Sequence, residues 1–331
     1  MDNNNVLKQI GNTPIIRLKQ ASDLTGCNIY GKAEYFNPGE SVKDRAALFI
    51  VEDAIKNKKI QKGGTIVEGT AGNTGIGLAI VAKAYDLNLK IVIPRTQSIE
   101  KKQTLISLGA ELIEVDAAPY SSPNNYIKQS KKIAEELSVS NKNGVFWANQ
   151  FDNIMNTESH IKTTSKELWT QTAGKIDGFV CAVGTGGTLA GVSIGLKEKN
   201  KNIKIALSDP MGSSLYSFIK FNKLENTGNS ITEGIGTGRI TENFEKALVD
   251  EAFQVNDEEA LNIIFNLKED QNIELGGSSG INIAGAIRLA KQMGPGHNIA
   301  TILCDPGKRY ASKIYNKEFL KSKNLPIPKW L

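Results

Sequence analysis

A lysine close to the start of a predicted helix could do covalent chemistry. The segment 37–45 reads NPGESVKDR, so Pro38 and Gly39 favour a turn and Ser41 is a candidate helix N-cap ahead of Lys43. A cation in a first helical turn is unfavourable, which is expected where the amine must lose its proton. Such a lysine can form a Schiff base with a carbonyl cofactor. The alternative is a solvated lysine at a helix start.

A glycine-rich loop after a predicted strand could bind an anion. Residues 68–77 read EGTAGNTGIG and open a helix, so their backbone N–H groups converge on a ligand such as a carboxylate or a phosphate. The side-chain amide of Asn73 adds a donor for an oxygen atom. The alternative is a glycine turn that packing alone requires.

Two further glycine-rich loops precede helices. Residues 184–188 read GTGGT, whose glycines let the backbone wrap around a phosphate while two threonine hydroxyls add donors. Leu189 stands where the dinucleotide fingerprint needs Gly or Ala, and the loop lacks the Gly-Lys-Ser/Thr of a P-loop, so a monophosphate fits better. Residues 276–280 read GGSSG, in which a serine could bond a heterocyclic nitrogen. Each loop could instead be structural, as a tight turn or a helix N-cap.

These loops need a scaffold, and the hydrophobic pattern alternates between short β-rich runs and amphipathic helices. Strands are predicted at 28–33, 65–68, 89–93, 111–115, 145–148, 178–183, 204–208 and 298–304. Helices between them are predicted at 44–58, 75–85, 126–137, 188–197, 257–269 and 281–293. This alternation indicates mostly parallel α/β sheets, and the number of strands favours two domains over one. Ligands of such sheets bind beyond the carboxyl ends of the strands.

The composition argues against several other classes of protein. Of 331 residues, 40 are basic and 35 acidic, and the lysine clusters are scattered without interleaved aromatics, so no nucleic acid is expected as a partner. The apolar runs fall far short of the ~20 residues of a membrane span. Cys27, Cys181 and Cys304 are widely spaced and odd in number, which indicates free thiols and, with no visible signal peptide, a cytoplasmic protein. His160 and His297 lack a second ligand at metal spacing, so no metal site is expected.

The four loops, in this order, resemble those of the fold-type II pyridoxal-phosphate (PLP) enzymes and, among them, the cysteine synthase (O-acetylserine sulfhydrylase) family. The resemblance runs from the GNTP motif at 11–14 to the strand end at 303–305 and covers nearly the whole chain. It implies two open, twisted α/β domains with pyridoxal 5'-phosphate in the cleft between them. The smaller, mobile domain would span 45–155, and the larger, cofactor-binding one 1–44 plus 156–331. The resemblance also implies a homodimer, with serine acetyltransferase as a possible partner.

The resemblance implies a role for each matching residue. Lys43 matches the Schiff-base lysine, Asn73 the asparagine that holds the pyridine 3-hydroxyl oxygen, and Ser278 the serine that faces the pyridine nitrogen. The residues matching the phosphate site are Gly184, Thr185, Gly186, Gly187 and Thr188. Those matching the substrate carboxylate site are Thr70, Ala71, Asn73, Thr74 and Gln150.

The implied chemistry is a β-replacement on an amino acid. A neutral serine opposite the ring nitrogen leaves that nitrogen unprotonated, which weakens the electron sink and favours prompt loss of a β-leaving group. Lys43, released by the amino-acid substrate, would take the α-proton. Sulfide adding to the resulting aminoacrylate would give cysteine. The resemblance therefore implies the conversion of O-acetyl-L-serine and sulfide to L-cysteine and acetate.

Three residues depart from the common cysteine synthase pattern. Ala71 stands where serine is frequent, Glu40 replaces a frequent glycine, and Glu233 precedes a glycine turn bordering the active site. These variants also occur in a subgroup that includes cysteine desulfhydrases, so conversion of cysteine to pyruvate, ammonia and sulfide is the alternative activity. A non-catalytic binding protein on the same scaffold is the third hypothesis. It would be expected to lose Lys43 or the 184–188 loop, and both are present.

Overall fold

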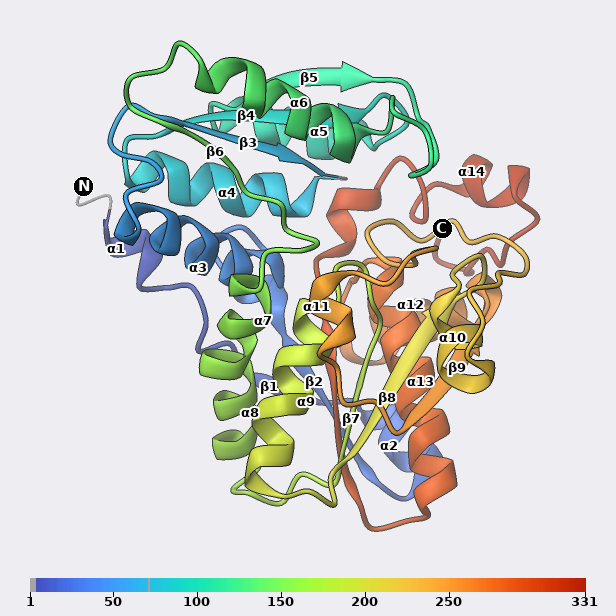
Figure 1. The fold of residues 1–331 in the computed structure, drawn as a ribbon. Helices are drawn as coiled ribbons and strands as arrows, with labels where there is room; N and C mark the ends of the chain where they lie inside the picture. Colours follow the sequence, from blue (N-terminus) through green and yellow to red (C-terminus); the bar gives the residue numbers. More distant parts are fainter. Residues whose placement is uncertain (1–3, 71) are drawn as a thin grey trace.

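The computed structural model describes residues 4–70 and 72–331, whose strands form two separate sheets (Figure 1). The strands are β1 (Ile15–Arg17), β2 (Asn28–Ala33), β3 (Thr65–Gly69), β4 (Asn88–Pro94), β5 (Glu111–Val115), β6 (Val145–Trp147), β7 (Gly178–Cys181), β8 (Lys204–Pro210), β9 (Glu251–Val255) and β10 (Asn298–Leu303). The six-stranded sheet has the order β1-β2-β10-β7-β8-β9 and the four-stranded sheet the order β5-β4-β3-β6. All pairs are parallel except β1 with β2.

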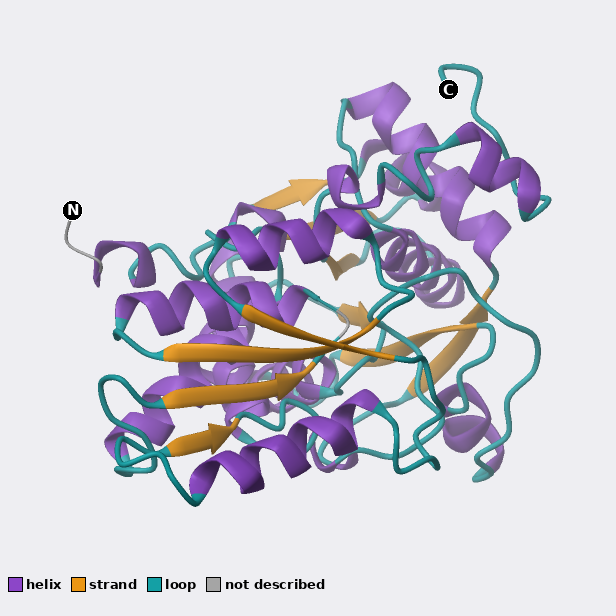
Figure 2. Ribbon diagram, turned by 90° about the horizontal axis from the view of Figure 1, so that it is seen from above, coloured by secondary structure: helices purple, strands orange, loops and turns teal. Residues whose placement is uncertain are grey.

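Helices cover both sheets on both faces, as Figure 2 shows from above. Those in the first half of the chain are α1 (Asn4–Leu7), α2 (Lys19–Thr25), η1 (Glu34–Phe36), α3 (Lys43–Lys56), α4 (Asn73–Ala84), α5 (Ile99–Ser107), α6 (Tyr126–Ser138), α7 (Met155–Ser159), the π-helix η2 (His160–Thr164) and α8 (Ser165–Gln171). The later ones are α9 (Gly187–Lys199), α10 (Leu215–Phe221), α11 (Glu242–Glu245), α12 (Asp257–Gln271), α13 (Gly277–Met293), η3 (Gly307–Tyr310) and α14 (Lys317–Ser322).

The four-stranded sheet is built entirely from the strands between residues 65 and 147. Its central strands β3 and β4 are apolar and buried, as expected for a parallel sheet covered on both faces. In Figure 1, α4 lies on one face and α6 on the other, and α3 packs against α4. A core of aliphatic side chains fills this layer, including Ile66, Leu78 and Ile91.

The six-stranded sheet takes its strands from both ends of the chain. Helix α13 packs along one face of this sheet, against β7, β8 and β10, while α9 packs against β7 from the other face (Figure 1). The strand β2 thus pairs with β10 although about 270 residues separate them. The chain therefore leaves this sheet after β2 and returns to it at β7.

The structure confirms the α/β fold with mostly parallel sheets, and each predicted strand and helix is present. The prediction missed β1 and β9, which form the two edges of the six-stranded sheet. These strands are short and only partly buried, so they carry no continuous apolar run. Helix α13 begins at Gly277, four residues earlier than predicted, which places Ser278 in its first turn. The division into domains at 45 and 155 stays a prediction, and the first of these boundaries falls inside the first turn of α3.

Candidate active site

Residues within three positions of the ends of strands in both sheets line one cavity of about 860 Å³. From the four-stranded sheet these are Thr70 after β3, Thr96 after β4 and Gln150 after β6. From the six-stranded sheet they are Gly184 after β7 and Cys304 after β10. The cavity therefore lies beyond the carboxyl ends of the strands, where ligands of open α/β sheets bind.

Lys43 reaches the cavity from the first turn of α3. Its backbone N–H lies 3.3 Å from the hydroxyl oxygen of Ser41, although Val42 rather than Ser41 occupies the N-cap position. The N–H of Val42 donates to the carbonyl of Cys304 at 3.1 Å. This bond ties the start of α3 to the end of β10 and so fixes where the lysine enters the cavity.

The loop between β3 and α4 forms another wall of the cavity. Thr70, Asn73 and Thr74 line it, and the hydroxyl of Thr74 donates to the side-chain carbonyl of Gln150 at 2.5 Å. The amide nitrogen of Gln150 lies 3.3 Å from the carbonyl oxygen of Gly69. These bonds join the loop after β3 to the loop after β6. The predicted substrate residue Ala71 lies outside the described residues.

A buried carboxyl group stands directly behind Gln150. The Glu68 side chain is 1 % exposed, and one of its oxygens lies 3.4 Å from the backbone nitrogen of Gln150. The other oxygen has no hydrogen-bond partner among the described residues. Burial raises the pKa of Glu68 to about 8, although hydrogen bonds from Gln150 and Asn149 oppose this shift.

The predicted phosphate loop approaches the cavity at the N-terminus of α9. Gly184 and Thr185 line the cavity, whereas Gly186, Gly187 and Thr188 do not. The hydroxyl of Thr188 instead lies 3.1 Å from a ring nitrogen of His160. Gly186 has φ +90°, and a Cβ atom there would lie 2.5 Å from the nitrogen of Phe244. Only glycine fits this position, because the turn packs directly against Phe244 in α11.

Ser278 and Cys304 form the wall beside Lys43, and both line the cavity. The Ser278 side chain lies in the first turn of α13 and is 5 % exposed. Burial raises the pKa of Cys304 to about 11, so its thiol keeps its proton at neutral pH. This wall therefore presents uncharged hydroxyl and thiol groups.

A cluster of charges also lines the cavity, and its lysines were not predicted from the sequence. The amine of Lys101, on α5, lies 2.6 Å from a carboxylate oxygen of Glu233, and Lys313 binds the other oxygen. Burial alone would raise the pKa of Glu233, but the two lysines lower it and keep the carboxylate charged. Lys101 is 2 % exposed, yet a lysine on an amphipathic helix gives no local signal of burial. Only Glu233, beside its glycine turn, was noted in the sequence.

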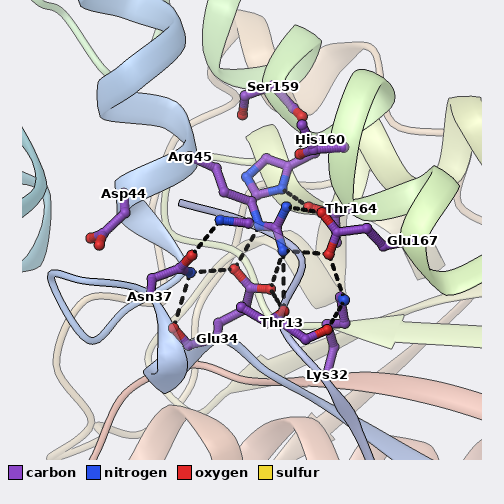
Figure 3. A network of polar contacts seen from close by, with 12 residues as sticks. Thr13, Lys32, Glu34, Asn37, Asp44, Arg45, Ser159, His160, Thr164 and Glu167 are labelled. Carbon is purple, nitrogen blue, oxygen red and sulfur yellow. Dashed lines mark hydrogen bonds and ion pairs between the residues drawn. The ribbon is translucent and has the colours of Figure 1, made fainter. Parts of the chain in front are cut away.

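A second, more deeply buried network holds the helix that carries Lys43 (Figure 3). The guanidinium of Arg45 donates to both oxygens of Glu34, each at 2.8 Å, and to both oxygens of Glu167, at 2.6 and 2.8 Å. Lys32 binds Glu167 at 2.6 Å, and Thr13 donates to Glu34 at 2.7 Å. Burial opposes ionisation of Glu34, but the charge and hydrogen bonds of Arg45, together with Lys32 and Thr13, outweigh it and lower the pKa of that carboxyl. The network anchors α3 one turn away from the cavity.

The residues present fit pyridoxal 5'-phosphate. Lys43 supplies an amine inside the cavity, and the turn before α9 offers backbone N–H groups at a helix N-terminus, a typical phosphate site. Asn73 and Ser278 supply neutral polar groups at the same cavity. The cavity volume of about 860 Å³ lies within the usual range for cofactor sites.

Comparison with known proteins places the chain in a class. Residues 6–305 match the family described as pyridoxal-phosphate dependent enzymes, so the chain belongs to that family. "Cysteine synthase 1" of Neurospora crassa is 46% identical over 321 residues, which cover 96% of this chain and 84% of that protein.

Two solved structures are similar along almost their whole length. A hydrogen sulfide-producing enzyme of Fusobacterium nucleatum has a TM-score of 0.81 and 33% identity, covering 92% of this chain and 98% of its own. The O-acetylserine dependent cystathionine beta-synthase of Helicobacter pylori has a TM-score of 0.83 and 32% identity, covering 94% and 98%. These likenesses confirm the resemblance to fold-type II PLP enzymes.

The described residues show neither a metal site nor a membrane-spanning helix. Within them, no group of three or more His, Cys, Asp or Glu side chains is arranged to hold a metal ion. Residues 4–70 and 72–331 include no helix that combines the length and the apolarity needed to cross a membrane. Cys27, Cys181 and Cys304 are free thiols, as predicted.

Proposed function

We propose that this chain is a cysteine synthase that converts O-acetyl-L-serine and sulfide to L-cysteine and acetate with pyridoxal 5'-phosphate. The observation that carries the proposal is the cavity itself, where Lys43 faces the loop of Thr70, Asn73 and Thr74. Membership of the PLP-dependent family supplies the cofactor. The full-length similarity to a curated cysteine synthase supports the reaction.

The residues of this chain divide the work around the cofactor. Bound PLP would supply an electron sink for charge at the substrate α-carbon. Lys43 would hold the aldehyde group and, once released by the substrate, take the α-proton, because its amine lies inside the cavity. The turn 184–188 would hold the phosphate through its backbone N–H groups. Ser278, which is neutral, would face the ring nitrogen without protonating it.

The substrate carboxylate would bind at the N-terminus of α4. Thr70, Asn73 and Thr74 lie there, and the first N–H groups of a helix attract anions. The bond between Thr74 and Gln150 holds both of these side chains in place before substrate arrives. Because the groups are already oriented, less ordering is needed on binding.

One experiment tests the proposal directly. Purified protein loaded with PLP is incubated with O-acetyl-L-serine, with and without sulfide, and cysteine is measured; O-phospho-L-serine is used in a parallel arm. We expect cysteine only when both substrates are present. Lys43→Ala should abolish this activity and the visible absorbance of the bound cofactor. Lys162→Ala, an exposed change on η2, should preserve both. Cysteine formation that persists in Lys43→Ala would overturn the proposal.

A cysteine desulfhydrase is the second candidate, and one finding favours it. The similar structure from Fusobacterium nucleatum is described as a hydrogen sulfide-producing enzyme. The same protein preparation, given cysteine alone, should release little sulfide if it is a synthase. Rapid and sustained formation of pyruvate and sulfide would reverse the ranking. A non-catalytic binding protein would show neither reaction.

The resemblance to cysteine synthases also supports assembly, whereas the predicted location rests on the free thiols. We infer a cytoplasmic homodimer, to be checked by analytical ultracentrifugation and by cell fractionation. Serine acetyltransferase is a possible partner, because the proposed substrate is the product of a serine acetylation. Co-sedimentation of the two purified proteins would test this association.

A further inference from the structure

The amide of Asn73 is held by two side chains from the other sheet. Asn73 is the first residue of α4, whereas Asp305 and Arg309 follow β10. The amide nitrogen of Asn73 donates to a carboxyl oxygen of Asp305 at 2.6 Å. Its carbonyl oxygen accepts from the guanidinium of Arg309 at 2.9 Å. Both the nitrogen and the oxygen of the Asn73 amide are thus held by residues that follow β10.

The chemistry of the two partners determines which way the amide points. A guanidinium can only donate, so the oxygen of Asn73 must face Arg309. Asp305 must then accept from the nitrogen, and it also accepts from the hydroxyl of Tyr310 at 2.6 Å. Rotating the amide by half a turn would place its NH2 group against the guanidinium of Arg309, so that donors would face donors. The observed orientation leaves the second N–H of Asn73 without a hydrogen-bond partner among the described residues, and Asn73 lines the cavity.

The two partners are themselves fixed to the other predicted cofactor contacts. Arg309 donates to the carbonyl of Gly39 at 2.5 Å, in the loop that leads to Lys43. Asp305 is fully buried, and a Cβ atom on Gly276 would lie 2.3 Å from its free oxygen, just before Ser278. One buried pair therefore touches the segments that carry Lys43, Asn73 and Ser278.

We propose that Arg309 and Asp305 are positioning residues that hold the Asn73 amide with its free N–H directed to the ring oxygen of bound PLP. The inference rests on the proposed role of Asn73 at the cofactor. A fixed amide needs no reordering when the ring enters, and the nearby guanidinium polarises it into a stronger donor. Asn73 follows a strand of the four-stranded sheet, whereas Asp305 and Arg309 follow a strand of the six-stranded sheet. The same contacts therefore couple binding of the cofactor ring to the distance between the two sheets.

The test measures cofactor binding as well as activity. Apoprotein of each variant is titrated with PLP, the dissociation constant is measured by fluorescence, and the visible spectrum of the loaded protein is recorded. We expect Arg309→Met to weaken PLP binding about tenfold, as loss of an outer supporting group commonly does, and to shift the spectrum in the same direction as Asn73→Ala. Lys308→Met is the matched control, because this exposed neighbour binds Glu40 without contacting Asn73.

A double variant shows whether Arg309 acts through Asn73. In an Asn73→Ala background, Arg309→Met should cause a smaller loss of PLP affinity than in wild type, since the amide that it orients is already gone and only the bond to Gly39 remains to be lost. Full additivity of the two changes would overturn the proposal. A wild-type affinity and spectrum in Arg309→Met, with a normal melting temperature, would also overturn it.

One further variant, together with the single variant Asn73→Ala, distinguishes the ways in which the test could fail. If Arg309→Met does not fold, Arg309→Lys keeps the charge but cannot serve Gly39 and Asn73 together as a planar fork does. An intermediate PLP affinity in Arg309→Lys supports the proposal, and an unchanged affinity and spectrum overturn it. If Asn73→Ala itself binds PLP normally, the role of Asn73 is wrong and the proposal fails with it. Cysteine formation by wild-type protein is measured separately, so failure of the positioning proposal would not count against the proposed reaction.

Discussion

Glu34, in η1, and Glu68, in β3, are both buried carboxyl groups. Their surroundings keep the first charged and the second neutral at pH 7. Glu34 accepts two hydrogen bonds from the guanidinium of Arg45, which lowers the pKa of the carboxyl despite its burial. Glu68 accepts a hydrogen bond from the backbone N–H of Gln150, and burial, with a smaller contribution from the charge of Asp152, raises its pKa to about 8. Burial alone therefore does not set the charge of a carboxyl group; the available partner does.

The difference also separates two kinds of structural task. Around Arg45 the charges compensate one another, which makes a rigid anchor for the helix of Lys43. Near the cavity, oxygen atoms of Glu68, Asn149 and Asp305 are buried and lack hydrogen-bond partners within the described part of the chain. Groups that are buried with unmet hydrogen-bonding capacity tend to gather at functional sites. The anchor is built for stability and the cavity wall for binding.

Removing Arg45 should cause the largest effect, because it breaks the compensated network. Arg45→Met leaves Glu34 buried and without its charged partner, which should lower the free energy of unfolding by about 4 kcal/mol. Urea denaturation of the purified protein measures this loss. Arg17→Met provides the control, since Arg17 forms an exposed ion pair with Asp23 and its loss should cost less than about 0.5 kcal/mol. Equal losses in the two variants would show that the buried network contributes nothing beyond a surface pair.

Replacing Glu68 should produce the next largest effect, and one that depends on pH. The folded protein keeps the Glu68 proton up to about pH 8, whereas the unfolded chain releases it near the ordinary pKa of about 4.3. Between these values the folded state binds the extra proton, so rising pH lowers stability through this group. Glu68→Gln is neutral at every pH, so its unfolding free energy relative to wild type should rise by about 2 kcal/mol from pH 5 to pH 7.

Urea denaturation at pH 5, 6 and 7 checks the prediction for Glu68. The exposed change Glu136→Gln on α6 should give a difference from wild type that stays nearly constant over the same range. A constant difference for Glu68→Gln would mean that Glu68 is already ionised in the folded protein. The contrast with Glu34 would then be lost.

Much of the cavity could be predicted from the sequence because its signals are local. The glycine-rich loops after predicted strands, together with the loop of Lys43, indicate Asn73, Gly184 and Ser278, and the structure brings all of them to one cavity. Their roles toward the cofactor stay predictions. The apolar runs that define most strands are equally local, which explains why the only strands missed were β1 and β9, at the two edges of the six-stranded sheet.

The remaining site residues depend on partners that are distant in the chain. Lys101 is buried because Glu233 meets it, and 132 positions separate the two residues. Arg309 touches Asn73 across 236 positions. Neither spacing leaves a pattern along the sequence. Arg309 could still have been suspected, because it follows β10 within a few residues, as the other cavity loops follow their strands.

His160 provides the smallest of the predicted effects, with the opposite sign to that of Glu68. Its ring is buried between the hydroxyls of Thr164, at 2.8 Å, and Thr188, at 3.1 Å, and burial lowers its pKa to about 3. The unfolded chain binds a proton near pH 6.5, so below that pH the unfolded state is favoured and stability falls. His160→Gln removes this dependence. Between pH 7.5 and pH 5.5, the free energy of unfolding of wild type should therefore fall by about 1 kcal/mol more than that of the variant.

Urea denaturation at the two pH values measures the difference, and His297→Gln, which keeps His160, should follow wild type. If His160→Gln also followed wild type, the ring would be protonated inside the fold, and a charged imidazole would then stand behind the turn proposed to bind phosphate.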